Sequence, residues 1–97
     1  MDEVKLDLND DGKGAFTIME NGQQLGEMVV GVSGDTLTAY HTEVSPFGNG
    51  KGVGKKLLNG MVEYAREKKL QVRALCSFVH SQFKRHPDEY SDIWKNN

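Results

Sequence analysis

The first 44 residues show the alternation of apolar and polar side chains that is typical of β-strands. In residues 4–8 every second side chain is apolar, which gives a period of two. Three further apolar runs, separated by turn sequences such as Asn21-Gly22, occupy residues 15–19, 25–32 and 36–44. Strands at this spacing, joined by tight turns and stopped at Pro46, predict an antiparallel meander of four strands.

After Pro46 the apolar residues recur at three- and four-residue spacing, which predicts an amphipathic helix from about 51 to 69. Its apolar face consists of Gly54, Leu57, Leu58, Met61, Val62 and Ala65. Residues 71–76 follow directly and predict a fifth strand. A strand, a crossover helix and a strand form a βαβ unit, so the fourth and fifth strands should run parallel.

The end of the chain predicts a second short helix over residues 78–85, ended by Pro87, and a further helical turn around Tyr90 and Trp94. The expected fold class is therefore α/β (α+β). It is an antiparallel β-meander followed by a βαβ crossover and a short C-terminal helix. We expect one domain that spans residues 1–97.

Composition excludes several classes of protein. The chain has 97 residues and a formal net charge of −2, so no strong positive field favours nucleic acid. No apolar run reaches the length of a membrane span, and the acidic start lacks the apolar stretch of a signal peptide. A single cysteine, Cys76, suits a reducing compartment. We expect a cytoplasmic monomer that binds neither nucleic acid nor a membrane.

The segment 45–56 carries the clearest chemical signal. Four of the eleven glycines lie within residues 48–54, immediately before the first helix. Glycine lets backbone N–H groups approach a ligand, and the first N–H groups of a helix lack internal partners at the positive end of its dipole. Lys51, Lys55 and Lys56 surround the same helix start, which favours a bound phosphate over a purely structural turn. The spacing fits neither a P-loop nor a dinucleotide fingerprint.

This segment resembles the acetyl-CoA-binding motif of the GNAT superfamily of N-acetyltransferases. The match is Gly50-Lys51-Gly52-Val53-Gly54-x-x-Leu57, with Asn49 where the motif usually has Gln or Arg. Further matches to the very small YjdJ-type GNAT-like proteins are His41-Thr42-Glu43-Val44, Tyr64-Ala65-Arg66, Leu75-Cys76-Ser77-Phe78-Val79 and His86-Pro87. Together the matches cover roughly residues 40–90.

The resemblance implies an enzyme that transfers the acetyl group of acetyl-CoA to an amine acceptor, such as a protein lysine or N-terminus. It implies that the fourth and fifth strands splay apart and admit the pantetheine arm of acetyl-CoA, while glycine-loop amides hold the pyrophosphate. The implied cofactor-binding residues are Val44, Asn49, Gly50, Lys51, Gly52, Val53, Gly54, Lys55 and Phe78. The alternative is a module that binds or senses acyl-CoA without turnover, because residues 77–86 lack the tyrosine that many family members use as a general acid.

Three side chains are catalytic candidates. The resemblance places Cys76 beside the acetyl thioester as nucleophile or proton relay, although a lone cysteine is more commonly a small core residue. Strand alternation places His41 on the same face as Glu43 and the apolar residues before it, where it could assist the thiol or serve structurally. Glu43 is a candidate general base for the amine. Cys76, His80 and His86 lack zinc-ligand spacing, so we expect no metal.

Overall fold

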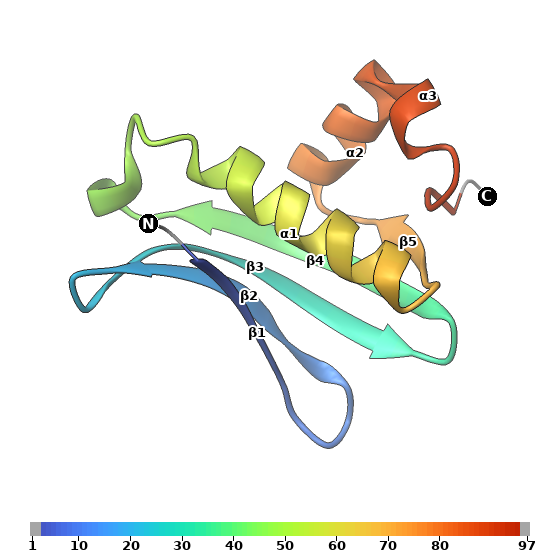
Figure 1. Ribbon diagram of the computed structural model, residues 1–97, viewed down its shortest axis with the longest axis horizontal. Helices are drawn as coiled ribbons and strands as arrows, with labels where there is room; N and C mark the ends of the chain where they lie inside the picture. The colour runs from blue at the N-terminus through green and yellow to red at the C-terminus, as the bar shows by residue number, and fades with distance from the viewer. Residues whose placement is uncertain (1–2, 96–97) are drawn as a thin grey trace.

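The computed structural model describes residues 3–95. The meander consists of β1 (Glu3–Leu8), β2 (Lys13–Glu20), β3 (Gln23–Ser33) and β4 (Thr36–Val44). It is followed by the 3₁₀-helix η1 (Pro46–Gly48), α1 (Val53–Glu67), β5 (Gln71–Ala74), α2 (Ser77–Arg85) and α3 (Pro87–Tyr90). The strands form one sheet in the order β1-β2-β3-β4-β5, in which only β4 and β5 are parallel (Figure 1). The predicted α/β fold, with its meander and crossover, is confirmed.

Two element boundaries differ from the prediction for local reasons. Helix α1 is shorter than predicted because Gly52 caps it with a left-handed backbone, φ +66°, and Lys69, φ +57°, ends its exit turn. Strand β5 ends at Ala74 because the next two backbone N–H groups, of Leu75 and Cys76, both turn to the Ala39 carbonyl, at 3.0 and 2.8 Å. The chain cannot extend the ladder once both donors share one acceptor.

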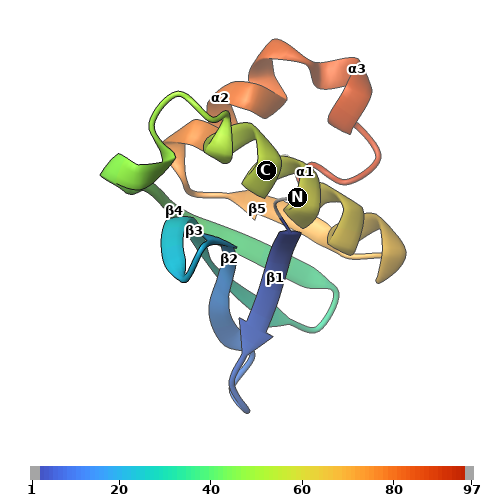
Figure 2. The ribbon, with the colours of Figure 1, turned by 60° about the vertical axis from the view of Figure 1, so that its left-hand side comes forward.

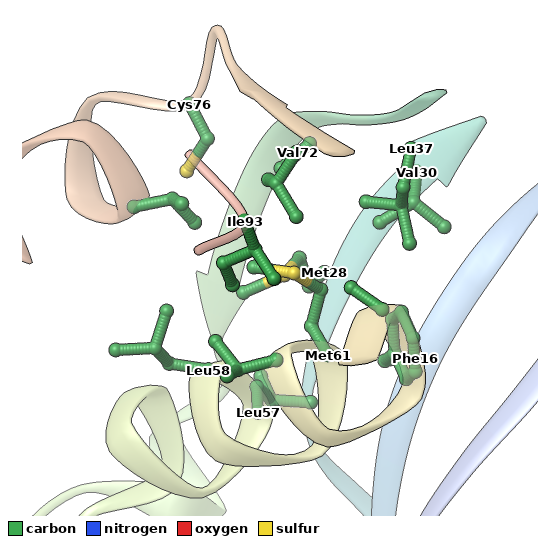
Figure 3. Close-up of a cluster of buried hydrophobic side chains, with 14 of the residues drawn as sticks. Phe16, Met28, Val30, Leu37, Leu57, Leu58, Met61, Val72, Cys76 and Ile93 are labelled. Atoms are coloured by element: carbon green, nitrogen blue, oxygen red, sulfur yellow. The ribbon is translucent and has the colours of Figure 1, made fainter. Parts of the chain in front are cut away.

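One hydrophobic core lies between the sheet and the helices, which gather on one side of the strands (Figure 2). The apolar stripe of α1 that the sequence predicts is buried against the inward side chains of the strands. Fully buried members from both layers, labelled in Figure 3, include Met28, Leu37, Leu57, Leu58, Met61 and Val72. Burying each such side chain contributes about 1.5–3 kcal/mol to folding.

The C-terminal segment covers the outer edge of β5. The backbone N–H of Val72 donates to Ile93 O at 2.6 Å, and that of Lys95 donates to Val72 O at 2.8 Å. Phe83 of α2 then packs against Tyr90, with ring centroids 4.7 Å apart, and edge-on against Trp94 at 5.8 Å. The predicted C-terminal turn therefore protects a sheet edge that would otherwise be exposed.

Candidate active site

The parallel pair β4–β5 is closed at one end and open at the other. The two strands pair only where residues 36–39 face residues 71–74. Strand β4 then continues for five residues, Tyr40–Val44, while the chain after β5 turns into α2 (Figure 1). We call the paired half, with its C-terminal cover, the closed end. The open end comprises residues 40–44, the glycine loop and the start of α2.

A β-bulge decides which side chains of β4 face the core at the open end. The register of β3 and β4 shifts at Tyr40, which is one extra residue in β4. Beyond the bulge, Thr42 is opposite the buried Met28 and therefore faces the helices. His41 and Glu43 face the other side of the sheet. The prediction that His41 shares the face of the preceding apolar residues is wrong, because the extra residue inverts the alternation.

His41 and Glu43 form an exposed pair on the outer face of the sheet. Their Nε2 and Oε2 atoms are 3.7 Å apart, and the side chains are 61% and 68% exposed. A pair so exposed contributes little to stability, at most about 1 kcal/mol. The structure brings these two candidates together, but on the face of the sheet opposite to Cys76.

Cys76 lies at the start of α2, two residues after β5, as the N-cap residue of that helix. It is 4% exposed and belongs to the core cluster, with its sulfur directed into the molecule (Figure 3). Its Sγ lies 3.2 Å from Oγ1 of Thr42 across the open end. Thr42 was not among the predicted site residues. The only signal for Thr42 in the sequence is that it belongs to the matched segment 41–44.

The glycine loop is held to the sheet at its beginning and opens at its end. The Ser45 hydroxyl donates to the carbonyls of Gln24 and Leu25, at 2.7 and 3.1 Å. At the other end Gly52 provides no side-chain cap for α1, and the first turn of the helix contains no acidic residue. The first backbone N–H groups of α1 therefore lack both an internal acceptor and a capping side chain, and they lie at the positive end of the dipole.

The predicted loop residues differ in what they offer a ligand. The Val53 side chain is buried, so its backbone is the accessible part, whereas Asn49 and Gly50 are exposed. Gly54 lies close to Phe78, because a Cβ there would be 3.2 Å from Cζ of that ring and the ring would have to shift by a few tenths of an ångström. Phe78 thus packs directly against the first turn of α1 and joins the two sides of the open end.

The predicted cationic residues Lys51 and Lys55 differ in whether the structure gives them an anionic partner. Lys51 is hydrogen-bonded to Glu20 at the end of β2, so its ammonium group already has an anionic partner. Lys55 is exposed in the first turn of α1. A phosphate at the helix start would therefore meet Lys55 directly and compete with Glu20 for Lys51.

Exposed apolar side chains concentrate at the open end. Of the five large exposed hydrophobic residues in the described part of the chain, four lie there: Tyr40 (47%), Val44 (42%), Phe47 (55%) and Leu75 (57%). They come from the end of β4, from η1 and from the residue after β5. Exposed apolar side chains of this size are available for contact with a ligand.

The closed end carries an ion pair between Arg66 and Asp92. A pocket of about 410 Å³ at the C-terminal end of α1 is lined in part by Arg66 and Asp92. The guanidinium Nε lies 2.9 Å from Asp92 Oδ2, and this hydrogen bond lowers the pKa of Asp92 and raises that of Arg66. Tyr90 is buried nearby, and burial raises the pKa of its hydroxyl. It packs on Phe83 at the closed end rather than at the open end.

Two further classes of site were searched for in residues 3–95. No group of three or more His, Cys, Asp or Glu side chains is arranged to hold a metal ion. No helix in this range is long and apolar enough to cross a membrane.

A meander whose last strand separates from a parallel partner, beside a glycine-rich helix start, is the arrangement of an N-acetyltransferase-like α/β fold. The chain belongs to the GCN5-related N-acetyltransferase family, whose profile it matches over residues 15–93. The narrower YjdJ-type assignment remains a prediction. No protein of curated function shows significant sequence similarity to the chain.

Two solved structures are similar to the chain. One is the solution NMR structure of a GCN5-like protein from Staphylococcus aureus that is assigned as an N-acetyltransferase. It has a TM-score of 0.68 and 32% sequence identity, over 96% of this chain and 89% of that one. The other is the crystal structure of nourseothricin acetyltransferase, with a TM-score of 0.54 and 32% identity. That match covers 70% of this chain and 42% of the larger enzyme.

Proposed function

We propose that the protein is an acetyl-CoA-dependent N-acetyltransferase that transfers an acetyl group to an amine acceptor. The observation that carries this proposal is the open end. There β4 leaves its parallel partner after Ala39, beside a helix start whose N–H groups have no cap. Members of the family use acetyl-CoA as co-substrate.

In this proposal the pantetheine arm lies along residues 40–44, where the edge of β4 turned toward β5 has lost its strand partner. Its amides pair with the backbone around Val44. The pyrophosphate binds the amides of residues 50–54, and Lys55 adds charge at the same place. Phe78, which packs on Gly54, lines the side of the opening formed by α2.

The chemical step is attack of the amine nitrogen on the thioester carbonyl, with departure of the CoA thiolate. A backbone N–H near Glu43 or Val44 would stabilise the oxyanion that develops on the carbonyl. In this direct step Cys76 gives a proton to the leaving thiolate from the inner side. In the two-step alternative the Cys76 thiolate itself attacks the acetyl-CoA carbonyl and releases the CoA thiolate, and the amine then attacks the acetyl-cysteine and frees the Cys76 thiolate. The pair of His41 and Glu43 would accept a proton from an amine that approaches from the outer side, and its exposure on that face supports this role.

A second candidate function is binding or sensing of acyl-CoA without turnover. The burial of Cys76 favours it, because only 4% of this residue is exposed. The position of Tyr90 also favours it, since this buried tyrosine packs at the closed end. An acceptor screen that measures CoA release distinguishes the two functions. Binding of acetyl-CoA with no acetyl transfer to any amine in that screen would select this alternative.

The chain offers a matched pair of glycines for testing where acetyl-CoA binds. Gly52 at the open end has φ +66° and Gly34 at the closed end has φ +59°, and a Cβ on either would meet nothing within 4 Å. Valine at both positions therefore imposes similar backbone strain. In isothermal titration with acetyl-CoA, Gly52→Val should bind at least tenfold more weakly than the wild type, whereas Gly34→Val should bind normally. Equal affinities for both folded variants would exclude the loop as the binding site.

A further inference from the structure

The thiol of Cys76 has a hydrogen-bonding partner that sequence reasoning did not identify. Among residues 3–95 its Sγ is 3.2 Å from the hydroxyl oxygen of Thr42, a residue 34 positions earlier in the chain. Either atom can act as the donor. The contact crosses the open end just beyond Ala39, where β4 and β5 separate.

The bulge in β4 selects this partner. If Tyr40 held a regular paired position in β4 instead of forming a bulge, the alternation that buries Ala39 would bring His41 to the inner face. With it, Thr42 takes the inner position opposite Met28. A bulge that re-aims one side chain next to a site is a common device, and here it replaces an imidazole with a neutral hydroxyl.

His41, a predicted helper of the thiol, and His80 of α2 both have other contacts. His41 lies 3.7 Å from Glu43 on the outer face of the sheet. The His80 ring is edge-on to Trp94, with centroids 5.8 Å apart. Neither contact involves the sulfur of Cys76, whose position is instead fixed by its helix-capping backbone and by Thr42.

We propose that Thr42 is the positioning residue for Cys76, holding the thiol in one orientation and donating a hydrogen bond to the sulfur whenever it carries negative charge. The proposal rests on the proposed function, in which the sulfur lies beside the acetyl thioester. Threonine suits this role because its branched side chain has few rotamers, so little freedom is lost when the hydroxyl is held in place. The reactivity of Cys76 should therefore depend on the Thr42 hydroxyl even without ligand.

The test is the alkylation rate of Cys76 by iodoacetamide at fixed, mildly alkaline pH. Cys76 is the only cysteine, so the signal has a single source. Thr42→Val removes the hydroxyl and keeps the shape, whereas Thr42→Ser keeps the hydroxyl. Thr42→Val removes a hydrogen bond to the attacking sulfur and the fixed orientation that it imposes, so we expect alkylation to slow by about three- to tenfold.

Thr42→Ser should restore alkylation to within about twofold of the wild type, a rescue that depends on the hydroxyl rather than on packing. Thr42→Ala provides a second variant without the hydroxyl, should the valine protein fail to fold. The proposal is wrong if the variants without the hydroxyl react at the wild-type rate, or if serine is as slow as valine.

A separate arm of the same assay tests the proposed function on which this inference depends. Acetyl-CoA added to the wild type should protect Cys76 from alkylation, because the thioester would cover the thiol. Lack of protection together with a slow Thr42→Val protein would overturn the placement of the thioester and retain the Thr42–Cys76 pair. Protection by acetyl-CoA together with unchanged alkylation of Thr42→Val would support the placement of the thioester and overturn the proposed role of Thr42.

Discussion

The two ends of the β4–β5 pair are built from the same two strands and differ in nearly every physical respect. At the closed end four residue pairs are in register, and the C-terminal segment covers the edge of β5. Its cation Arg66 is matched to Asp92. At the open end β4 has lost its parallel partner, the glycine loop leaves helix N–H groups uncapped, and large apolar side chains are exposed.

This difference separates stability from binding within one small chain. At the closed end strand pairing satisfies the backbone hydrogen bonds, and aromatic side chains are buried against one another. This end therefore stabilises the fold. The open end leaves the first backbone N–H groups of α1 uncapped and several large apolar side chains exposed, which costs stability and makes these groups available to a ligand. Substitutions at the closed end should therefore change the free energy of unfolding, and substitutions at the open end should change ligand binding or acetyl transfer.

The largest effect is expected at the closed end. Phe83 is fully buried against Tyr90 and Trp94, so Phe83→Ala should lower the free energy of unfolding by about 3–5 kcal/mol. Denaturant titration measures this loss. At a temperature where the variant is folded, its affinity for acetyl-CoA should stay within about twofold of the wild type. A tenfold weaker affinity would show that the two ends are not separable.

The next effect concerns chemistry at the open end. Cys76→Ala should keep acetyl-CoA affinity within a few-fold while lowering acetyl transfer by about ten- to a hundredfold. Cys76→Ser separates thiol chemistry from packing. Mass spectrometry distinguishes the two roles of the thiol, since only a covalent relay adds an acetyl group to Cys76. If alanine costs stability through a small cavity and the folded protein turns over normally, Cys76 is structural.

A smaller effect is expected from the lysines at the start of α1. Changing Lys55 and Lys56 together to Gln should weaken acetyl-CoA binding several-fold at low salt and flatten its dependence on ionic strength. Lys55→Gln alone should leave the free protein equally stable or slightly more so, because a cation at a helix N-terminus opposes the dipole by about 0.3–1 kcal/mol. Unaltered affinity at every salt concentration would assign these lysines to the solvated surface.

The smallest effect is expected from the ion pair of the closed end. The hydrogen bond from Arg66 lowers the pKa of Asp92. The pair therefore stabilises the fold at pH values above the ordinary carboxyl pKa, and this stabilisation is lost as the pH falls through the lowered pKa. Both side chains are about half exposed, at 43% and 56%, which limits the contribution to less than about 1 kcal/mol. Asp92→Asn should be slightly less stable than the wild type at neutral pH and equally stable in strong acid. A constant difference across pH would contradict this account.

Most of the fold could be predicted from the sequence because periodicity and turn chemistry are local. The strand from Thr36 to Val44, the apolar stripe of α1 and the parallel crossover followed from spacing alone. The glycine loop was equally visible, since a cluster of glycines and lysines marks a helix start. The region beyond Tyr40 was harder, because a bulge is set by pairing with β3 and leaves no periodic signal.

The bulge at Tyr40 explains why the details of the site could not be predicted. It turned His41 outward and brought Thr42 to Cys76, a contact between residues far apart in sequence. The pairing of Lys51 with Glu20 was likewise not predictable, since it depends on where the β2–β3 turn lies relative to the loop. Local patterns predict elements, whereas contacts between elements depend on register.

The central claim is that acetyl-CoA binds at the open end and leaves the closed end unchanged. A titration followed by amide correlation NMR tests it most directly, because every backbone N–H reports separately. Adding acetyl-CoA should shift the amides of residues 40–44 and 50–55, whereas those of residues 36–38 and 71–73, in the same two strands, should stay in place. Shifts confined to the closed end, or no shifts at millimolar acetyl-CoA, would contradict the account.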